Sequence, residues 1–377
     1  MAPRLKNQSD RGVGMTGRQR VSAILHKRPA DRLCWAPLVD GHTLGELPPP
    51  LRGTSELDFY RHLGSDILVL GGYEGSVVRL ASPALVWPAE VRLETRQAGE
   101  ERTIQWRTPW GRLTQVRRRG HPVKFPVASL ADLKIYRSMW EGASYEARDD
   151  RAACKAADDA LGQDGVLTRF WGPSTIPMLL EEVMGTEAFY YLLADHPADM
   201  EALFAVIHGR ELRAFELLAA GPWEAAILCE NTSTYYLSPD VYRRHSGPHV
   251  RDFVAAMHAA GKPALVHMCG HVRNILDLIS QTGLDGIHAL TPPPTGDTPW
   301  ELALDALGED LVIIGVLDPT IFISGPLRDI GPALSRLITP RVRRSNFILG
   351  TFADGLAVPL ERFQAVAAWV EQNGGRS

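Results

Sequence analysis

Residues 264–297 read ALVHMCGHVRNILDLISQTGLDGIHALTPPPTGD, and this stretch decides the fold. A short apolar run ends in the motif H-M-C at 267–269 and passes directly into a helical pattern of apolar residues over 272–279. A second strand-like run, 285–290, closes on a proline-rich turn. This order predicts one βαβ unit with polar side chains at the carboxyl ends of both strands.

The polar residues at these two strand ends are of the kinds that bind metal. Side chains two apart on a strand share a face, so we expect His267 and Cys269 to project together and His288 to reach the same space. Catalytic zinc usually takes three protein ligands and favours imidazole and thiolate. We therefore predict a zinc site of His267, Cys269 and His288, with Glu230 or Asp354 as a fourth ligand. The spacing leaves a structural alternative open, in which the three are a strand cap, a buried thiol and a packed imidazole.

The rest of the chain continues the strand-then-helix order. Predicted strands lie at 33–39, 66–70, 166–171, 225–229, 264–267, 285–289, 311–316 and 346–350. Eight such units in one chain of this length predict an α/β fold, a (β/α)8 TIM barrel, with a doubly wound sheet as the alternative.

Two segments depart from this rhythm. Residues 16–32 predict an N-terminal helical extension, and residues 76–125 alternate apolar and polar side chains around a turn at 98–100. That alternation predicts a β-hairpin region inserted into the barrel. We expect residues 1–15 to be a disordered lead-in and residues 16–377 to form a single domain.

The composition of the chain indicates which partners and which cellular compartment to expect. The 377 residues carry a formal charge of −4 without a basic tail, so neither nucleic acid nor an anionic membrane surface is an expected partner. The four cysteines lack paired spacing, which argues for a reducing compartment. Because no apolar stretch approaches membrane-spanning length and no signal-peptide pattern is present, we expect a cytoplasmic protein.

Other polar residues follow the predicted strands, where TIM barrels place their active sites. Glu230 and Asn231 are expected to orient substrate, act as a general base or ligate metal, with helix capping as the alternative. Asp40 ends the first predicted strand, and Asp318 follows the seventh, where it could contact a ligand or only fix its loop.

Aromatic residues are predicted near the same face. Trp35, Tyr235 and Tyr236, together with Trp171, would line a pocket suited to a flat substrate or cofactor. Packing into the core is the alternative for each of them, because aromatic side chains are common in protein cores.

A longer pattern carries a family resemblance. Residues 237–297, IIGVLDP at 313–319, NFILGT at 346–351 and PLERFQAVAAWV at 359–370 together resemble the uroporphyrinogen decarboxylase superfamily. Within it, the chain is more similar to the branch of cobalamin-linked methyltransferases than to the decarboxylases. The resemblance implies a (β/α)8 barrel, in agreement with the strand count.

The decarboxylase motifs themselves are missing. Where the decarboxylase has an arginine-bearing M-R-Q-A-G-R motif, this chain has LVDGH at 38–42. Where the decarboxylase has an aspartate after the second strand, this chain has glycines at 71–72. Its histidine after the last strand is replaced by Gly-Thr-Phe at 350–352. Without those arginines a tetrapyrrole with many carboxylates has little to hold it, so porphyrin decarboxylation is not expected.

The zinc methyltransferases of this branch resemble the chain at H-x-C, which carries over to His267 and Cys269. Their glutamate near the end of the next strand is His288 here, and their second cysteine falls in 351–354, which holds none. The resemblance implies a zinc-dependent methyltransferase of corrinoid-linked metabolism, which moves a methyl group between a small methylated substrate or methylcobamide and an acceptor such as a thiol.

The resemblance also implies partners and leaves alternatives. Methylcobamide would arrive on a separate corrinoid protein, and a homodimer is left open. One alternative function is a decarboxylase-like lyase on a smaller substrate, with Asp40 or Glu230 as acid or base. The other is a non-catalytic barrel that binds a corrinoid protein.

Overall fold

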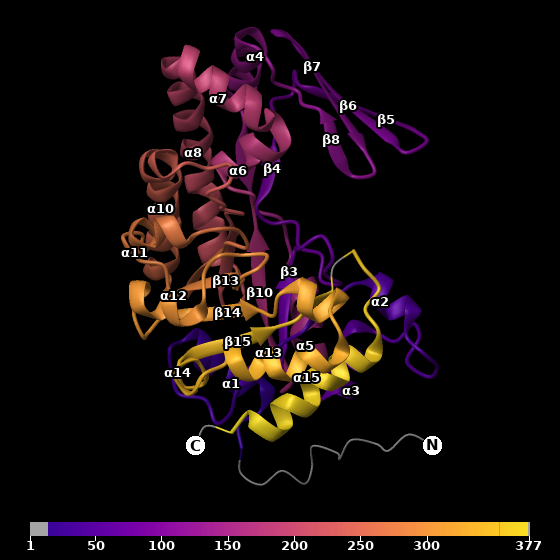
Figure 1. Cartoon of the computed structure of the whole chain (residues 1–377). Helices are drawn as coiled ribbons and strands as arrows, with labels where there is room; N and C mark the ends of the chain where they lie inside the picture. The colour runs from indigo at the N-terminus through magenta and orange to yellow at the C-terminus, as the bar shows by residue number, and fades with distance from the viewer. Residues whose placement is uncertain (1–13, 354, 376–377) are drawn as a thin grey trace.

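Eight parallel strands form a nearly closed barrel in the computed structural model, which describes residues 14–353 and 355–375 (Figure 1). Their hydrogen-bonded order is β1-β15-β14-β13-β12-β11-β10-β3. The strands are β1 (Cys34–Trp35), β3 (Ile67–Gly71), β10 (Gly165–Trp171), β11 (Ala226–Cys229), β12 (Ala264–His267), β13 (Gly286–Leu290), β14 (Val312–Val316) and β15 (Asn346–Gly350). The predicted TIM barrel is confirmed.

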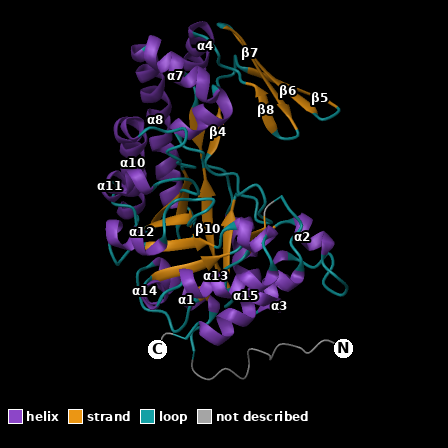
Figure 2. Cartoon of the chain, in the orientation of Figure 1, coloured by secondary structure: helices purple, strands orange, loops and turns teal. Residues whose placement is uncertain are grey.

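Helices follow the strands and surround the barrel (Figure 2). The helices of the outer layer are α3 (Glu56–Leu63), α5 (Arg151–Leu161), α8 (Pro197–Ala220), α10 (Gly247–Ala259), α11 (Leu276–Ser280), α12 (Trp300–Leu307), α13 (Ile330–Leu337), α14 (Pro340–Arg344) and α15 (Leu360–Asn373). Among the described residues, no helix has both the length and the apolar character that crossing a membrane requires.

The remaining helical segments lie between these elements along the chain. They are α2 (Gly41–Glu46), α4 (Leu130–Glu141), α6 (Thr175–Met178), α7 (Gly185–Asp195), α9 (Pro239–Val241), the π-helices η2 (Leu179–Val183), η3 (Tyr242–Ser246) and η5 (Thr320–Ser324), and the 3-10 turns η4 (Arg273–Ile275) and η6 (Leu327–Asp329).

Alternate side chains of the strands divide into a lumen layer and an outer layer, as the two-residue period of a strand requires. The lumen cluster includes Leu68, Leu70, Val166, Ala225, Ile227, Leu265, Val312, Ile314 and Ile348. The outer layer packs under the helices and includes Val69, Leu167, Leu228, Val266, Ile313 and Phe347. Residues that continue the lumen rows therefore reach the mouth at the carboxyl ends of the strands.

The predicted first strand is two short strands. Pro37 has no backbone N–H to donate to a sheet, and the strand is interrupted there. β1 precedes the break and pairs with β15, while β2 (Leu38–Val39) follows it and pairs with β16 (Phe352–Ala353).

The predicted N-terminal helix is confirmed as α1 (Gly17–Leu25). The Thr16 side chain accepts a hydrogen bond from the backbone N–H of Gln19, and the Gln19 side chain accepts one from the Thr16 N–H, which makes a capping box. Val21, Ile24 and Leu25 join the lumen cluster. α1 therefore closes the amino-terminal end of the barrel.

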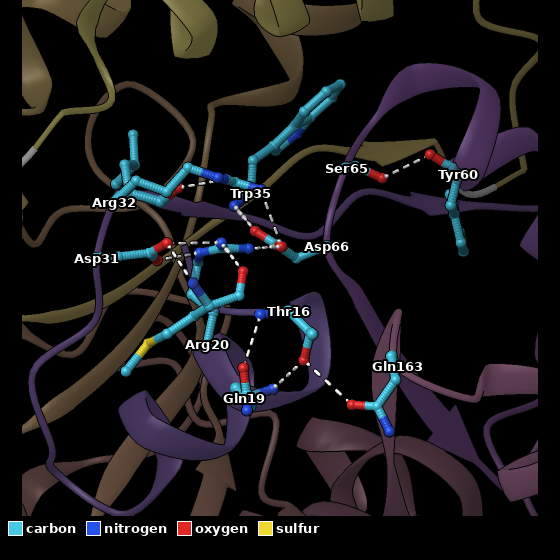
Figure 3. Close-up of polar contacts among 12 residues, drawn as sticks. Thr16, Gln19, Arg20, Asp31, Arg32, Trp35, Tyr60, Ser65, Asp66 and Gln163 are labelled. Carbon is cyan, nitrogen blue, oxygen red and sulfur yellow. Dashed lines mark hydrogen bonds and ion pairs between the residues drawn. The ribbon is translucent and has the colours of Figure 1, made fainter. Parts of the chain in front are cut away.

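Polar contacts at this closed end join the two edge strands of the barrel (Figure 3). The Asp66 N–H donates to the Trp35 carbonyl at 2.9 Å, and the Trp35 N–H donates to the Asp66 carboxylate at 3.4 Å. Arg20 forms ion pairs with Asp66 and, at 2.6 Å, with Asp31, and Arg32 reaches Asp66 at 3.0 Å. Side-chain charge thus links β1 to β3, which share no strand ladder in the described sheet.

The predicted β insertion is confirmed as an antiparallel sheet that projects away from the barrel (Figure 1). Its strands are β5 (Arg92–Ala98), β6 (Glu101–Thr108), β7 (Gly111–Arg118) and β8 (His121–Lys124), and β4 (Ala84–Val86) pairs separately with β9 (Ser144–Glu146). Ala98 pairs with Glu101 across the predicted turn. The expected lead-in lies outside the described residues except for Gly14 and Met15, and the single-domain assignment stays a prediction.

Candidate functional site

Two imidazoles meet at the mouth of the barrel. His267 ends β12 and His288 lies opposite it in β13, so parallel pairing brings both onto the lumen face. Their Nδ1 atoms are 2.7 Å apart, so one ring donates a hydrogen bond to the other. Phe170 lies against His267 with ring centroids 5.3 Å apart, and Phe352 lies 5.5 Å from His288. The structure therefore brings together two of the predicted metal ligands.

Both imidazoles are held in the neutral form. Burial lowers the pKa of His267 to about 4. Burial also lowers the pKa of His288 far below its usual range, and the neighbouring His267 adds to this shift. Neutral imidazole is the form that binds metals, because it keeps one nitrogen lone pair free.

Cys269 lies at the rim and not in the lumen row. β12 ends at His267, the next side chain, Met268, is fully buried, and Cys269 is exposed. Because the strand ends before Cys269, the expectation that residues two apart share a face rests here on a loop and stays a prediction. The thiol interacts electrostatically with Glu181 and with Cys229.

The donors fit zinc in kind, since the mouth offers imidazoles and thiols. Within residues 14–353 and 355–375, however, no third His, Cys, Asp or Glu ligand atom lies within 4.8 Å of both imidazoles. Asp354, a predicted fourth ligand, lies outside the described residues. The zinc site of His267, Cys269, His288 and Asp354 therefore stays a prediction.

Glu230 lies behind the barrel wall. Ala225 and Ile227 belong to the lumen cluster, so the alternation of the strand turns Glu230 the other way. Its carboxylate is fully buried and accepts hydrogen bonds from Ser174 and, at 3.1 Å, from Thr232. Burial raises the pKa of Glu230 to about 8, so the side chain is mostly a neutral acid at pH 7.

Asn231, the next residue, forms hydrogen bonds with two side chains at the rim of the barrel mouth. Its backbone adopts a φ of 45°, in the left-handed region, and its amide donates to Glu181 at 3.0 Å. The hydroxyl of Tyr236 donates to the Asn231 carbonyl. Burial raises the pKa of Glu181 above its usual range. Asn231 therefore positions a carboxyl group and a phenol next to Cys269.

Glu181 and Cys229 also border the mouth and were not predicted from the sequence. Glu181 comes from η2 and stands within the apolar run MLLEEVM at 178–184, and a carboxylate in such a run is the signal that could have revealed it. Cys229 lies beside His267 in the β11–β12 pairing. Its side chain contacts Asn231 at 3.5 Å, which adds a second thiol to the mouth.

The two predicted catalytic aspartates hold loops in place. Asp40 caps α2 through the Thr43 N–H at 2.9 Å, and its second oxygen accepts from the Gly355 N–H at 2.7 Å. Asp318 is fully buried and accepts from Thr320 and from the Thr295 N–H, both at 2.8 Å. Both carboxylates are thus occupied by backbone donors, and a catalytic role for either stays a prediction.

The four predicted pocket aromatics do not come together, and Trp171 packs in the outer-layer core. Trp35 is 2% exposed in the outer layer, and its indole donates to Thr351 at 3.1 Å. Tyr235 is 80% exposed, with its ring 3.9 Å from that of His271. Of the four, Tyr236 borders the mouth, through its hydrogen bond to the loop after β11.

A known protein of low sequence identity shares this architecture. A methyltransferase from Methanosarcina mazei is 13% identical, with a TM-score of 0.60 over 95% of this chain and 99% of that chain, a likeness that shows the fold alone. The pneumococcal virulence factor StrH is also 13% identical, with a TM-score of 0.38 over 59% of this chain and 63% of that chain. No curated protein matches the sequence. The family model of uroporphyrinogen decarboxylase (URO-D) matches residues 141–372, which is more than half of the sequence. The chain therefore belongs to the uroporphyrinogen decarboxylase family.

Proposed function

We propose that this chain is a zinc-dependent methyltransferase of corrinoid-linked one-carbon metabolism. The observation that carries the proposal is the pair of neutral imidazoles, His267 and His288, at the mouth of a URO-D family barrel, with the Cys269 thiol at the rim. The likeness in fold to an archaeal methyltransferase over nearly the full length supports it.

His267, His288 and Cys269 are the residues that would hold the zinc. When bound there, zinc supplies a Lewis acid that lowers the pKa of an acceptor thiol. Phe170 and Phe352 flank the imidazole pair and present apolar surface to the reacting groups. These rings help to exclude water, which strengthens electrostatic interactions at the mouth.

The proposed reaction transfers a methyl group to a thiol. The thiolate sulfur attacks the methyl carbon of a methylcobamide, the S–C bond forms, and the Co–C bond breaks with its electron pair left on cobalt. We assign Glu181, beside Cys269 and Asn231, to receive the proton that the thiol loses. The methylcobamide would be presented by a corrinoid protein that docks over the strand-end face of the barrel.

The test follows methylcobalamin with a set of small thiols and zinc-loaded protein. We expect thiol-dependent loss of the Co–C bond by the native chain and a decrease of ~100-fold in His267→Ala and in Cys269→Ala. His258→Ala, an exposed histidine on α10, is the matched control and should keep full activity. If methylcobalamin stays intact with every thiol in the presence of metal-loaded native protein, the proposal is wrong.

A carboxy-lyase is the second candidate, and the raised pKa of Glu230 favours it. A carboxyl group that is neutral at pH 7 can protonate the carbanion left after loss of carbon dioxide. This reading requires Glu230 to act despite its orientation away from the lumen. Release of carbon dioxide that survives His267→Ala and is lost in Glu230→Gln would favour the lyase over the methyltransferase.

A further inference from the structure

A second group of metal-binding side chains lies outside the barrel, where α8 packs against α10 (Figure 1). His208 and Glu211 are three residues apart on α8, and His249 comes from the first turn of α10. One ligand atom from each lies within 4.8 Å of those of the other two. In the described part of the chain, this is the only such group of three.

Two nitrogen atoms of this group lack the partners that buried polar atoms normally have. The Nδ1 atoms of His208 and His249 are buried without a hydrogen-bond partner, and the two rings stack 3.7 Å apart. Glu211 is 1% exposed, and its one ion-pair partner among the described residues is His208, at 3.8 Å. Buried polar groups without partners are costly, and a carboxylate without a countercharge costs most. One cation would satisfy all three groups.

Neighbouring residues orient these ligands. Asp252 lies 2.7 Å from Nε2 of His208 and, in the neutral ring, would accept the proton held there, so that Nδ1 is the nitrogen left to bind a metal. The Thr175 hydroxyl donates to Glu211 at 2.6 Å and fixes its carboxylate. A carboxylate behind a metal-binding histidine is the usual outer-shell arrangement of zinc sites.

We propose that His208, Glu211 and His249 bind a divalent transition-metal ion, with Zn²⁺ as the preferred occupant. Two imidazoles and one carboxylate form a ligand set that zinc commonly takes in proteins. The ion ties α8 to α10 and, through Thr175, to α6, which follows β10 at the mouth. Its charge also lies close to Glu230, which interacts electrostatically with Glu211. This site is independent of the zinc proposed at the mouth.

The first experiment measures the metal content of the full chain. The parent protein carries His267→Ala and Cys269→Ala, which remove two of the proposed ligands at the mouth, and every further variant is made in this parent. After chelation and reloading with Zn²⁺, mass spectrometry should find about one ion per chain. Glu211→Gln should lose that ion, whereas Glu216→Gln, an exposed glutamate on the same helix, should keep it. Equal zinc in Glu211→Gln and its parent would overturn the proposal.

A spectroscopic measurement separates the two sites. Co²⁺ bound by imidazole and carboxylate should give d–d absorption bands without the thiolate charge-transfer band that a site containing Cys269 adds. Zn²⁺ at a hundredfold excess over its Kd should raise the Tm of the same parent protein by ~3 °C. If no d–d bands appear when Co²⁺ is added to the stripped parent protein, the site does not exist.

Asp252→Asn keeps the proposal testable if changes at the buried ligands prevent folding. Its side chain is 51% exposed, so the variant should fold, and the loss of the carboxylate behind His208 should weaken Zn²⁺ binding by ~10–100-fold. An unchanged Zn²⁺ affinity in this variant would contradict the assigned ligation of His208 through Nδ1.

Discussion

Replacing Glu230 by glutamine should remove a large pH dependence from the stability of this protein. Glu230 is fully buried, and in the described part of the chain Ser174 and Thr232 are its hydrogen-bond donors, so burial raises its pKa from the ordinary 4.5 to about 8. The folded chain therefore holds a proton on Glu230 that the unfolded chain releases above pH 4.5. The stability that this neutral carboxyl contributes is present in full below pH 4.5 and is lost as the pH rises towards 8.

The size of the effect follows from the shift in pKa. Each pH unit between the unfolded and folded pKa values reduces the stability of the native chain by ~1.4 kcal/mol relative to a variant that cannot ionise. From pH 5 to pH 7.5 the native chain should lose ~3 kcal/mol relative to Glu230→Gln. Glutamine retains an acceptor oxygen for Ser174, so the hydrogen bond is preserved.

Urea unfolding at a series of pH values, with chelator present to keep metal from the nearby Glu211, measures this difference. Glu216→Gln, exposed on α8, is the control and should follow the pH profile of the native chain. If Glu230→Gln and the native chain show parallel stability profiles from pH 5 to 7.5, then Glu230 is ionised in the folded protein. The assignment of Glu230 as a neutral acid would then be refuted.

Three further changes test other parts of the structure. Asp66→Ala leaves the buried Arg20 short of one partner and should reduce the free energy of unfolding by ~3–5 kcal/mol in urea titrations, and a loss below 1 kcal/mol would contradict the role given to this pair. Gly165→Ala would place a Cβ 2.1 Å from the Ile67 carbonyl oxygen, so we expect a lower Tm in calorimetry, and an unchanged Tm would show that the two strands are not packed this closely. Tyr235→Ala should change stability by less than ~0.5 kcal/mol because the ring is 80% exposed, while a large rise in KM would restore its predicted role in binding.

The barrel could be predicted because its signals are local. Each strand is a short apolar run followed by a helical pattern. The spacing of apolar and β-branched residues identifies such a strand or helix without information on the residues that pack against it. The break in the first strand was not predicted, although Pro37 within that run is the signal for it. The insertion was readable because its alternation has the period of an antiparallel strand, with a turn at Gly99.

The site was harder to predict because it depends on where strands end and on contacts distant in sequence. Cys269 would share a face with His267 only if β12 were two residues longer. Trp35 lies one residue from the lumen-facing Cys34, and that single step puts it in the outer layer. The cluster of His208 and His249 joins residues on two helices, so only helix packing brings them together.

The barrel has one weakly joined seam, which is the boundary between its edge strands β1 and β3. Every other neighbouring pair of barrel strands is joined by a strand ladder, whereas this pair meets at one backbone hydrogen bond and the Asp66 carboxylate. Thermal opening of the barrel should therefore begin there, and the amides of β3 should exchange with solvent sooner than those of β13, which is paired on both sides. The ion pair of Arg20 with Asp66 lies beneath this seam and is almost fully buried, so added salt should screen it little and the two edges should stay joined at high ionic strength.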